Sequence, residues 1–127
     1  MPRPDKSRPT DAELEILQVL WEHGPATVRQ VFDVLSAGGR QTGYTTVLKL
    51  MQIMFDKGFV TRDEAQRSHI YSAKLKQQST QRQFVRDMLD KVFGGATEQL
   101  VLQALNAKKV SPEELAGIRK LLDQFEK

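Results

Sequence analysis

With 127 residues, the chain can form one domain, or a small domain with an appended dimerisation element. It contains no cysteine, which excludes disulfides, cysteine-liganded zinc and a thiol nucleophile. The net charge of +3 indicates no partner by itself, and neither a transmembrane run of about 20 apolar residues nor a signal-peptide core occurs, so we expect a cytoplasmic protein without direct membrane binding.

The charge is distributed unevenly. Residues 10–39 carry one arginine and five acidic residues, whereas residues 40–76 carry seven lysines or arginines and three acidic residues. A basic segment that follows an acidic pair of helices has the polarity that a phosphate-facing surface needs. Ordinary solvated faces explain the same distribution equally well.

The first predicted element is a helix that follows a polar segment. Residues 1–9 are basic and contain three prolines, which indicates a disordered arm. Thr10 and Glu13 have the spacing of a capping box, so a helix is expected to begin there and to end at Gly24. Its apolar residues at helical spacing are Leu14, Leu17, Leu20 and Trp21.

Two more helices with an apolar stripe follow. The second begins after Thr27 as its cap and ends at residues 37–39. The third runs from near Gly43 to about Lys57, with Gly58 in the C-cap position. Its predicted inward residues are Val47, Leu50, Met51 and Met54.

A two-stranded hairpin is expected next. Residues 59–62 and 69–72 have a β pattern, and the polar residues 63–68 form the turn between them. Three helices followed by a hairpin with a charged tip are typical of a winged helix. We therefore interpret residues 10–76 as a winged helix-turn-helix domain.

Residues 77–127 are predicted to form three amphipathic helices. The clearest start is Ser111, which is followed by a proline and, three residues on, by Glu114. Three helices that together contain only about 50 residues cannot bury all of these wide apolar faces against one another. Pairing with a second copy would cover these faces, and we favour this interpretation. The alternative is that the bundle packs back on the winged helix of its own chain.

The third helix carries the residues that we expect to face DNA. In a helix-turn-helix the second helix of the pair enters the major groove. With the apolar stripe turned inward, its outer face presents Thr45, Thr46, Lys49 and Gln52. Their hydroxyl, ammonium and amide groups can contact phosphates and base edges. The alternative interpretation is a solvated helix face.

Two flanking groups complete the predicted DNA-binding surface. Gln41, Thr42 and Tyr44 lie where the third helix begins, and backbone N–H groups at a helix start favour a phosphate. Arg62 and Arg67 flank the hairpin tip and are expected to contact a phosphate or the minor groove. Arginines on a hairpin can also serve solubility alone.

No catalytic, metal or cofactor site is predicted. His23 and His69 lie in different elements, and neither has metal-ligand spacing around it. The glycine pair at 94–95 is typical of a helix-ending turn. No nucleophile elbow, zinc-protease, phosphate-loop or dinucleotide motif occurs, so we expect a protein that is not an enzyme.

Several segments, taken in order and spacing, resemble one known family. They are Leu20–Ala26 (LWEHGPA), Gly43–Val47 (GYTTV), Asp56–Gly58, Leu89–Gly95 (LDKVFGG) and Ser111–Leu115 (SPEEL). Together they resemble the penicillinase-repressor (BlaI/MecI-type) transcriptional regulators over nearly the whole chain from residue 10.

The resemblance implies a mainly α fold, with a winged helix-turn-helix followed by a three-helix dimerisation domain. It implies a homodimer without a cofactor that represses genes at a palindromic operator in double-stranded DNA. Within the helix from Tyr44 to Lys57, Thr45, Thr46 and Lys49 would be the principal base-reading residues. The implied dimer interface consists of Phe84, Met88, Leu89, Val92, Phe93, Leu100, Leu105, Ile118, Leu121 and Leu122.

The chain departs from the family's pattern in three places. Leu48 and Lys49 stand where many members have a basic residue and a threonine, so the operator sequence is not transferred. A membrane sensor-protease triggers cleavage of an Asn-Phe bond in antibiotic-responsive members, whereas the matching bond here is Gln103–Ala104. The C-terminal cysteines of copper-responsive relatives are absent.

One other class of function is compatible with these observations. A winged helix can serve as a protein-interaction adaptor that does not bind DNA, because a fold does not determine a function. The two hypotheses differ in salt dependence, since binding that is driven by phosphate contacts weakens steeply as salt rises.

Overall fold

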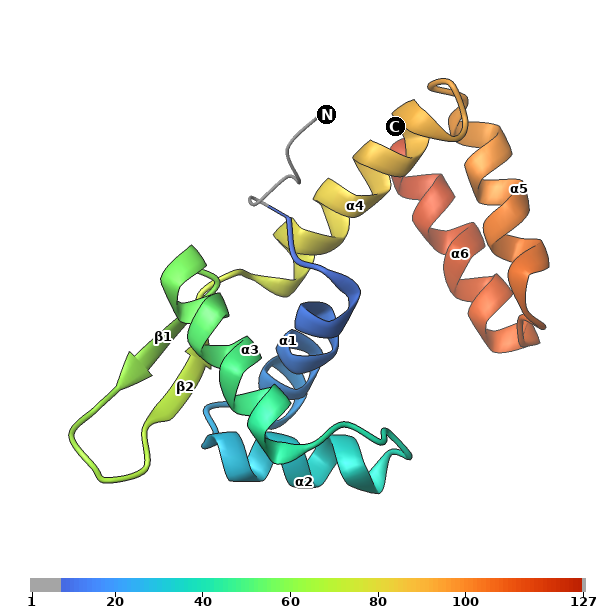
Figure 1. Cartoon of the computed structure of the whole chain (residues 1–127). Coiled ribbons are helices and arrows are strands. Elements are labelled where there is room, and N and C mark those ends of the chain that lie inside the picture. Colours follow the sequence, from blue (N-terminus) through green and yellow to red (C-terminus); the bar gives the residue numbers. More distant parts are fainter. Residues whose placement is uncertain (1–7, 127) are drawn as a thin grey trace. The chain divides into compact units, whose positions relative to one another are not determined.

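The structure is a computed structural model that describes residues 8–126. These residues form six helices and one two-stranded antiparallel sheet, as Figure 1 shows. In chain order the elements are α1 (Asp11–His23), α2 (Val28–Ala37), α3 (Tyr44–Lys57), β1 (Val60–Asp63), β2 (Ile70–Ala73), α4 (Gln77–Lys91), α5 (Thr97–Ala107) and α6 (Pro112–Phe125). The chain divides into two compact units, Met1–Gln81 and Arg82–Lys127. The predicted fold class, a winged helix-turn-helix followed by a helical domain, is confirmed.

Helix boundaries follow the predicted capping residues. The Thr10 side chain accepts from the Glu13 backbone N–H at 3.2 Å, and the Glu13 carboxylate accepts from the Thr10 N–H at 2.9 Å. Thr27 and Gln30 form the same reciprocal pair at the start of α2. Gly58 ends α3 with φ of 83°, a left-handed conformation that glycine adopts without strain.

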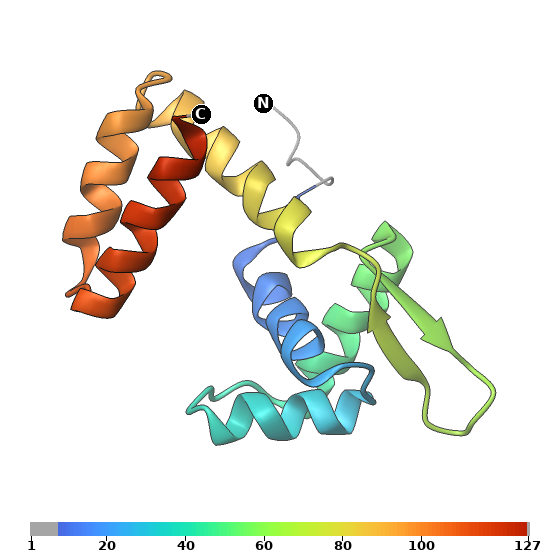
Figure 2. The same ribbon diagram turned by 180° about the vertical axis from the view of Figure 1, so that it is seen from behind.

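The core of the first unit is built from α1, α2, α3 and the base of the hairpin. Helix α1 packs on α3, and the two helices lie side by side in the view from behind (Figure 2). Beyond the predicted positions, Ile16 and Val19 are buried too, whereas Leu14 and Trp21 are half-buried. The buried apolar residues are Ile16, Leu17, Val19, Leu20, Ala26, Val28, Val31, Val47, Met51, Met54, Phe59, Val60 and Tyr71.

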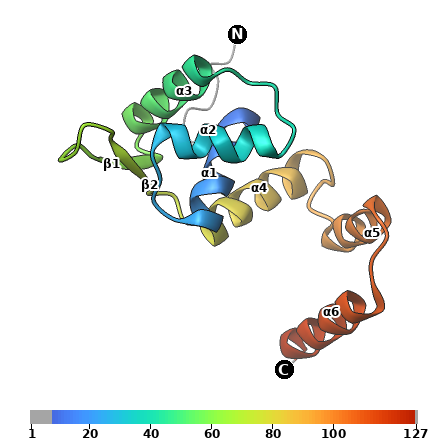
Figure 3. The same cartoon turned by 90° about the horizontal axis from the view of Figure 1, so that it is seen from below.

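The hairpin is fastened to the helices by backbone hydrogen bonds. Its strands pair antiparallel, with Arg62 opposite Tyr71, and each strand lies one residue later than predicted. Ala26, in the link between α1 and α2, bridges to Tyr71 through two backbone hydrogen bonds of 2.8 and 3.0 Å. The hairpin therefore has a fixed base beside α3, and α3 and the hairpin are neighbours in the view from below as well (Figure 3).

A buried ion pair links the start of α1 to the end of α3. The Glu13 side chain is 1% exposed, and both its oxygens accept from Lys57 Nζ, at 2.9 and 3.1 Å. The ammonium group of Lys57 also lies 5.4 Å from the centroid of the Phe59 ring. Burial of a carboxylate is tolerated here because it is both paired and hydrogen-bonded.

The second unit is helical and exposed. No residue of α5 or α6 is buried among those that the structure describes, and the buried residue of α4, Thr80, lies before this unit begins at Arg82. No helix within residues 8–126 is long and apolar enough to cross a membrane. Of the predicted arm, residues 1–7 lie outside the described part of the chain, and Pro9 is buried.

Candidate nucleic-acid interface

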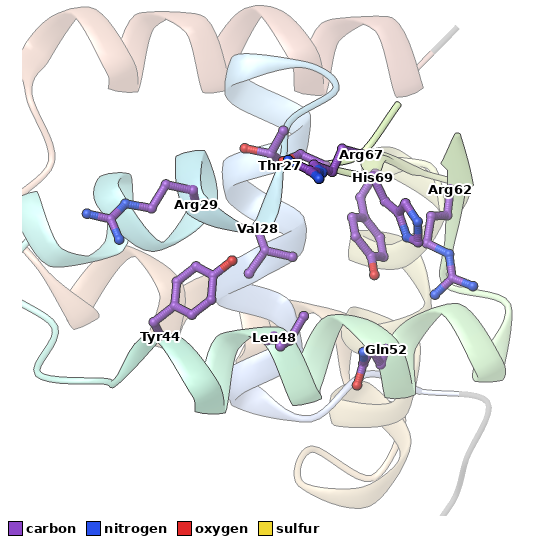
Figure 4. A pocket seen from close by; sticks show the side chains of 11 residues that line it. Thr27, Val28, Arg29, Tyr44, Leu48, Gln52, Arg62, Arg67 and His69 are labelled. Atoms are coloured by element: carbon purple, nitrogen blue, oxygen red, sulfur yellow. The ribbon is translucent and has the colours of Figure 1, made fainter. Parts of the chain in front are cut away.

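The outer face of α3, the start of α2 and the hairpin enclose one open pocket of about 270 Å³ (Figure 4). The three elements meet there because the capping residue Thr27 starts α2 beside the hairpin and because the Ala26–Tyr71 bridge fixes the hairpin's base. The pocket is lined by Thr27, Val28, Arg29, Tyr44, Leu48, Gln52, Arg62, Arg67, Ser68, His69 and Tyr71.

Helix α3 supplies an exposed polar face. Its inward residues Val47, Met51 and Met54 are fully buried, which fixes the rotation of the helix. The predicted DNA-facing residues on the opposite side are all exposed. Gln52 lines the pocket, and Thr45, Thr46 and Lys49 lie on the same helix outside the pocket lining.

Tyr44, at the start of α3, belongs to a small aromatic cluster. Its ring meets the Phe32 ring edge-on, with 5.8 Å between centroids, and is 39% exposed. The guanidinium of Arg29 lies 5.6 Å from the Phe32 centroid and 6.0 Å from that of Tyr44. The other two predicted residues at this end, the exposed Gln41 and the half-buried Thr42, do not line the pocket.

Sequence reasoning missed Arg29. It lies in the first turn of α2, lines the pocket beside Tyr44 (Figure 4), and pairs with Asp33 one turn later at 3.5 Å. A signal was available, because the first helix of a helix-turn-helix crosses the DNA backbone. A basic side chain near the start of that helix can therefore reach a phosphate. Thr27, Ser68 and His69 were likewise not assigned to this surface by their sequence positions.

The two hairpin arginines differ in their surroundings. Arg67 is exposed and lines the pocket from the hairpin tip. The Arg62 side chain is only 19% exposed, and its guanidinium lies 4.0 Å from the centroid of the Phe55 ring and 3.1 Å from a Glu64 carboxylate oxygen. A side-chain hydrogen bond with Tyr71 raises the pKa of Arg62 above its ordinary value, so the group stays charged.

The electrostatic character of the pocket is basic. Three arginines line it, and no acidic residue does. Another hollow, between α1 and α2, has Glu15, Glu22 and Arg40 as its charged lining residues. There Glu15 pairs with Arg40 through two hydrogen bonds and raises the pKa of Arg40. The pocket beside α3, rather than the hollow between α1 and α2, is therefore suited to an anion.

Metal chemistry has no support in the described residues. Within residues 8–126 no group of three histidine, aspartate or glutamate side chains could hold a metal ion. His23 and His69 line different pockets, on different elements.

The predicted dimer-interface residues lie on helices with large apolar exposure. Val92 is 70% exposed, Leu121 and Leu122 are each 54% exposed, and Met88 is 48% exposed. The other predicted residues, which are half-buried, are Phe84, Leu89, Phe93, Leu100, Leu105 and Ile118. Sequence reasoning did not place Phe125 in this set, although its ring is 83% exposed.

The predicted cleavage bond lies inside a helix. Gln103 and Ala104 are both exposed, and they belong to α5, which continues to Ala107. A protease binds its substrate as an extended segment, so a cut at this bond requires α5 to unwind locally.

Comparison with known proteins gives a consistent result. Residues 9–124 match the penicillinase repressor family. The chain is 23% identical over 115 residues to the penicillinase repressor of Bacillus licheniformis, covering 91% of this chain and 89% of that protein. It is 28% identical over 117 residues to the transcriptional regulator BlaI of Mycobacterium tuberculosis (strain CDC 1551 / Oshkosh), covering 91% and 83%. It is 20% identical over 115 residues to the methicillin resistance regulatory protein MecI of Mammaliicoccus sciuri, covering 91% and 93%.

These matches extend over both structural units and agree with the resemblance that the sequence motifs indicate. By name these relatives are a repressor, a regulatory protein and a transcriptional regulator, and the family is not one of enzymes. The prediction that the protein is not an enzyme is confirmed by this relationship. The chain belongs to the penicillinase repressor family.

Proposed function

We propose that this protein is a transcriptional repressor that binds a palindromic operator in double-stranded DNA as a homodimer. The observation that carries the proposal is the basic pocket beside the exposed polar face of α3. DNA presents a dense row of phosphates next to a groove wide enough for a helix. A basic concavity adjoining such a helix matches both features.

The residues divide into two roles. Thr45, Thr46 and Lys49 of α3, together with Gln52, read base edges in the major groove, where a lysine pairs with guanine acceptors and a glutamine with adenine. The second role is neutralisation of phosphates on either side of the groove. It falls to Arg29 and Arg67, with Gln41, Thr42 and Tyr44 placing the start of α3 against the backbone.

Dimer formation covers the apolar surface of the second unit. Residues such as Val92 and Leu121 are more than half exposed, and α5 and α6 contain no buried residue. A two-fold arrangement would bury these faces and place two copies of α3 about one DNA turn, roughly 34 Å, apart. Two weak half-site contacts then act as one strong contact, because the second binds at a high effective concentration.

Release of the operator follows from loss of the dimer. We place the regulatory cut, made after a signal from a membrane sensor-protease, at Gln103–Ala104, which would separate α6 from the rest of the chain. A variant with a recognition site for a specific laboratory protease inserted at this bond should lose DNA binding after digestion. Unchanged binding by the cut protein would contradict this part of the proposal.

A salt titration tests the proposed function. Binding of the full chain to a mixed-sequence duplex, followed by fluorescence anisotropy, should weaken steeply between 50 and about 200 mM salt, because bound counterions are released from the DNA. The absence of any duplex binding at low salt would reject the proposal and favour a winged-helix adaptor that binds protein partners.

A further inference from the structure

We infer that Arg62 is a positioning residue, which holds the hairpin against α3 and acts on DNA binding through Arg67. This inference rests on the proposed function. The sequence analysis predicts that Arg62 and Arg67 both contact DNA, and the inference assigns Arg62 a different role. The experiment below separates failure of the inference from failure of the proposed function.

The contacts of Arg62 connect three elements. Its guanidinium lies 4.0 Å from the centroid of Phe55, which belongs to α3. It lies 6.0 Å from the centroid of Tyr71, the residue opposite it on β2. Its Nη2 atom is 3.1 Å from Glu64, at the start of the turn. One planar cation thus joins the recognition helix, both strands and the turn, since a guanidinium can stack on rings and donate in its plane at once.

The same contacts make Arg62 a poor phosphate ligand. Its side chain is 19% exposed, and the Glu64 carboxylate offsets its charge. Its Nε atom is buried and has no hydrogen-bond partner within the described part of the chain, so this N–H group is not accessible to a phosphate. A phosphate would have to compete with the Glu64 carboxylate, which already accepts from Nη2.

Arg67 has the opposite character. Both arginines line the basic pocket, but Arg67 is exposed and no ion pair engages it among residues 8–126. Residues 63–68 are all exposed, so Arg62 is the last residue of β1 that is largely buried before the tip begins. The position of Arg67 over the pocket therefore depends on how firmly Arg62 fixes the hairpin.

A double-mutant cycle in the full chain tests the inference. Affinity for a mixed-sequence duplex and its dependence on salt would be measured for Arg62→Ala, Arg67→Ala and the double variant. Each single variant should weaken binding by roughly fivefold and reduce the salt slope by about one, the effect of one lost phosphate contact. The double variant should match Arg67→Ala alone in both quantities.

Two variants separate positioning from charge and from a general loss of folding. Phe55→Leu keeps every charge, and Arg62→Lys keeps the charge without the planar group. Both should reproduce the loss that Arg62→Ala causes, and neither should weaken binding further when Arg67 is already alanine. A merely structural defect would weaken both backgrounds equally, and thermal unfolding followed by circular dichroism would show it.

The outcomes are distinct. Additive losses, with a salt slope that falls by about two in the double variant, would show that Arg62 contacts a phosphate itself and would overturn the inference. An Arg62→Ala variant with wild-type affinity would overturn it as well. If the wild-type protein binds no duplex at low salt, the proposed function fails instead.

Discussion

At the scale of single residues, Glu13 illustrates what the sequence pattern can and cannot predict. Its spacing from Thr10 predicts the capping box, because both partners lie within one helical turn. Its ion pair with Lys57 spans 44 residues of sequence and depends on how α1 packs on α3, so the pattern gives no signal of it. The same reason explains why the sequence gives no signal of the contact between Arg62, which was predicted to contact DNA, and Phe55 of α3.

Replacement of Glu13 by alanine should destabilise the protein by about 2–4 kcal/mol, because it removes a cap and leaves the Lys57 ammonium partly buried without its partner. Glu15→Ala is the matched control. Its ion pair with Arg40 is largely exposed, so the loss should be much smaller than that of Glu13→Ala. Urea unfolding measures the free energy of unfolding of both variants. If Glu13→Ala lost no more stability than Glu15→Ala, the ion pair of Glu13 with Lys57 would be energetically unimportant.

At the scale of elements, local patterns predict the helices well and the site only in part. Apolar spacing and capping residues determine where α3 begins, where it ends and which side it buries, and so they also predict its exposed face. Arg29 was missed because its proposed role depends on the pocket beside α2, α3 and the hairpin, which no local pattern describes. The two strands were predicted one residue early, because a β pattern does not determine at which residue the ladder of backbone hydrogen bonds begins.

Lys49→Ala should weaken DNA binding by about 1–3 kcal/mol, which is the range for one specific base contact. Thermal stability should be unchanged, because Lys49 is exposed. Lys108→Ala, an exposed lysine between α5 and α6, is the control for loss of one positive charge. Anisotropy titration at fixed salt compares the two, and an equal loss in both variants would indicate that only net charge matters.

At the scale of the whole molecule, the two units differ in how their apolar residues are covered. The first unit has a core of its own, whereas α5 and α6 contribute no buried residue. The sequence predicts these apolar stripes correctly, but a stripe does not determine what covers it. Helices this short are marginal in water without tertiary packing, so a second copy would contribute the missing contacts.

Introduction of a charge on the apolar side of α6 should therefore break the proposed dimer. Leu121→Glu is expected to give a monomer in analytical ultracentrifugation and to reduce operator affinity by at least about a hundredfold, because the two half-site contacts are no longer linked. Ala116→Glu places the same charge on another side of α6 and should remain dimeric. A Leu121→Glu protein that stays dimeric would place the interface elsewhere.

The most direct test of the central claim is selection of bound duplexes from a random-sequence DNA pool, performed with the full chain at two salt concentrations. A sequence-specific dimeric repressor should enrich a palindrome whose half-sites are centred about 10 base pairs apart, and enrichment should sharpen at the higher salt as nonspecific binding weakens. Recovery of no common sequence at either salt concentration would contradict the assignment of α3 as a base-reading helix.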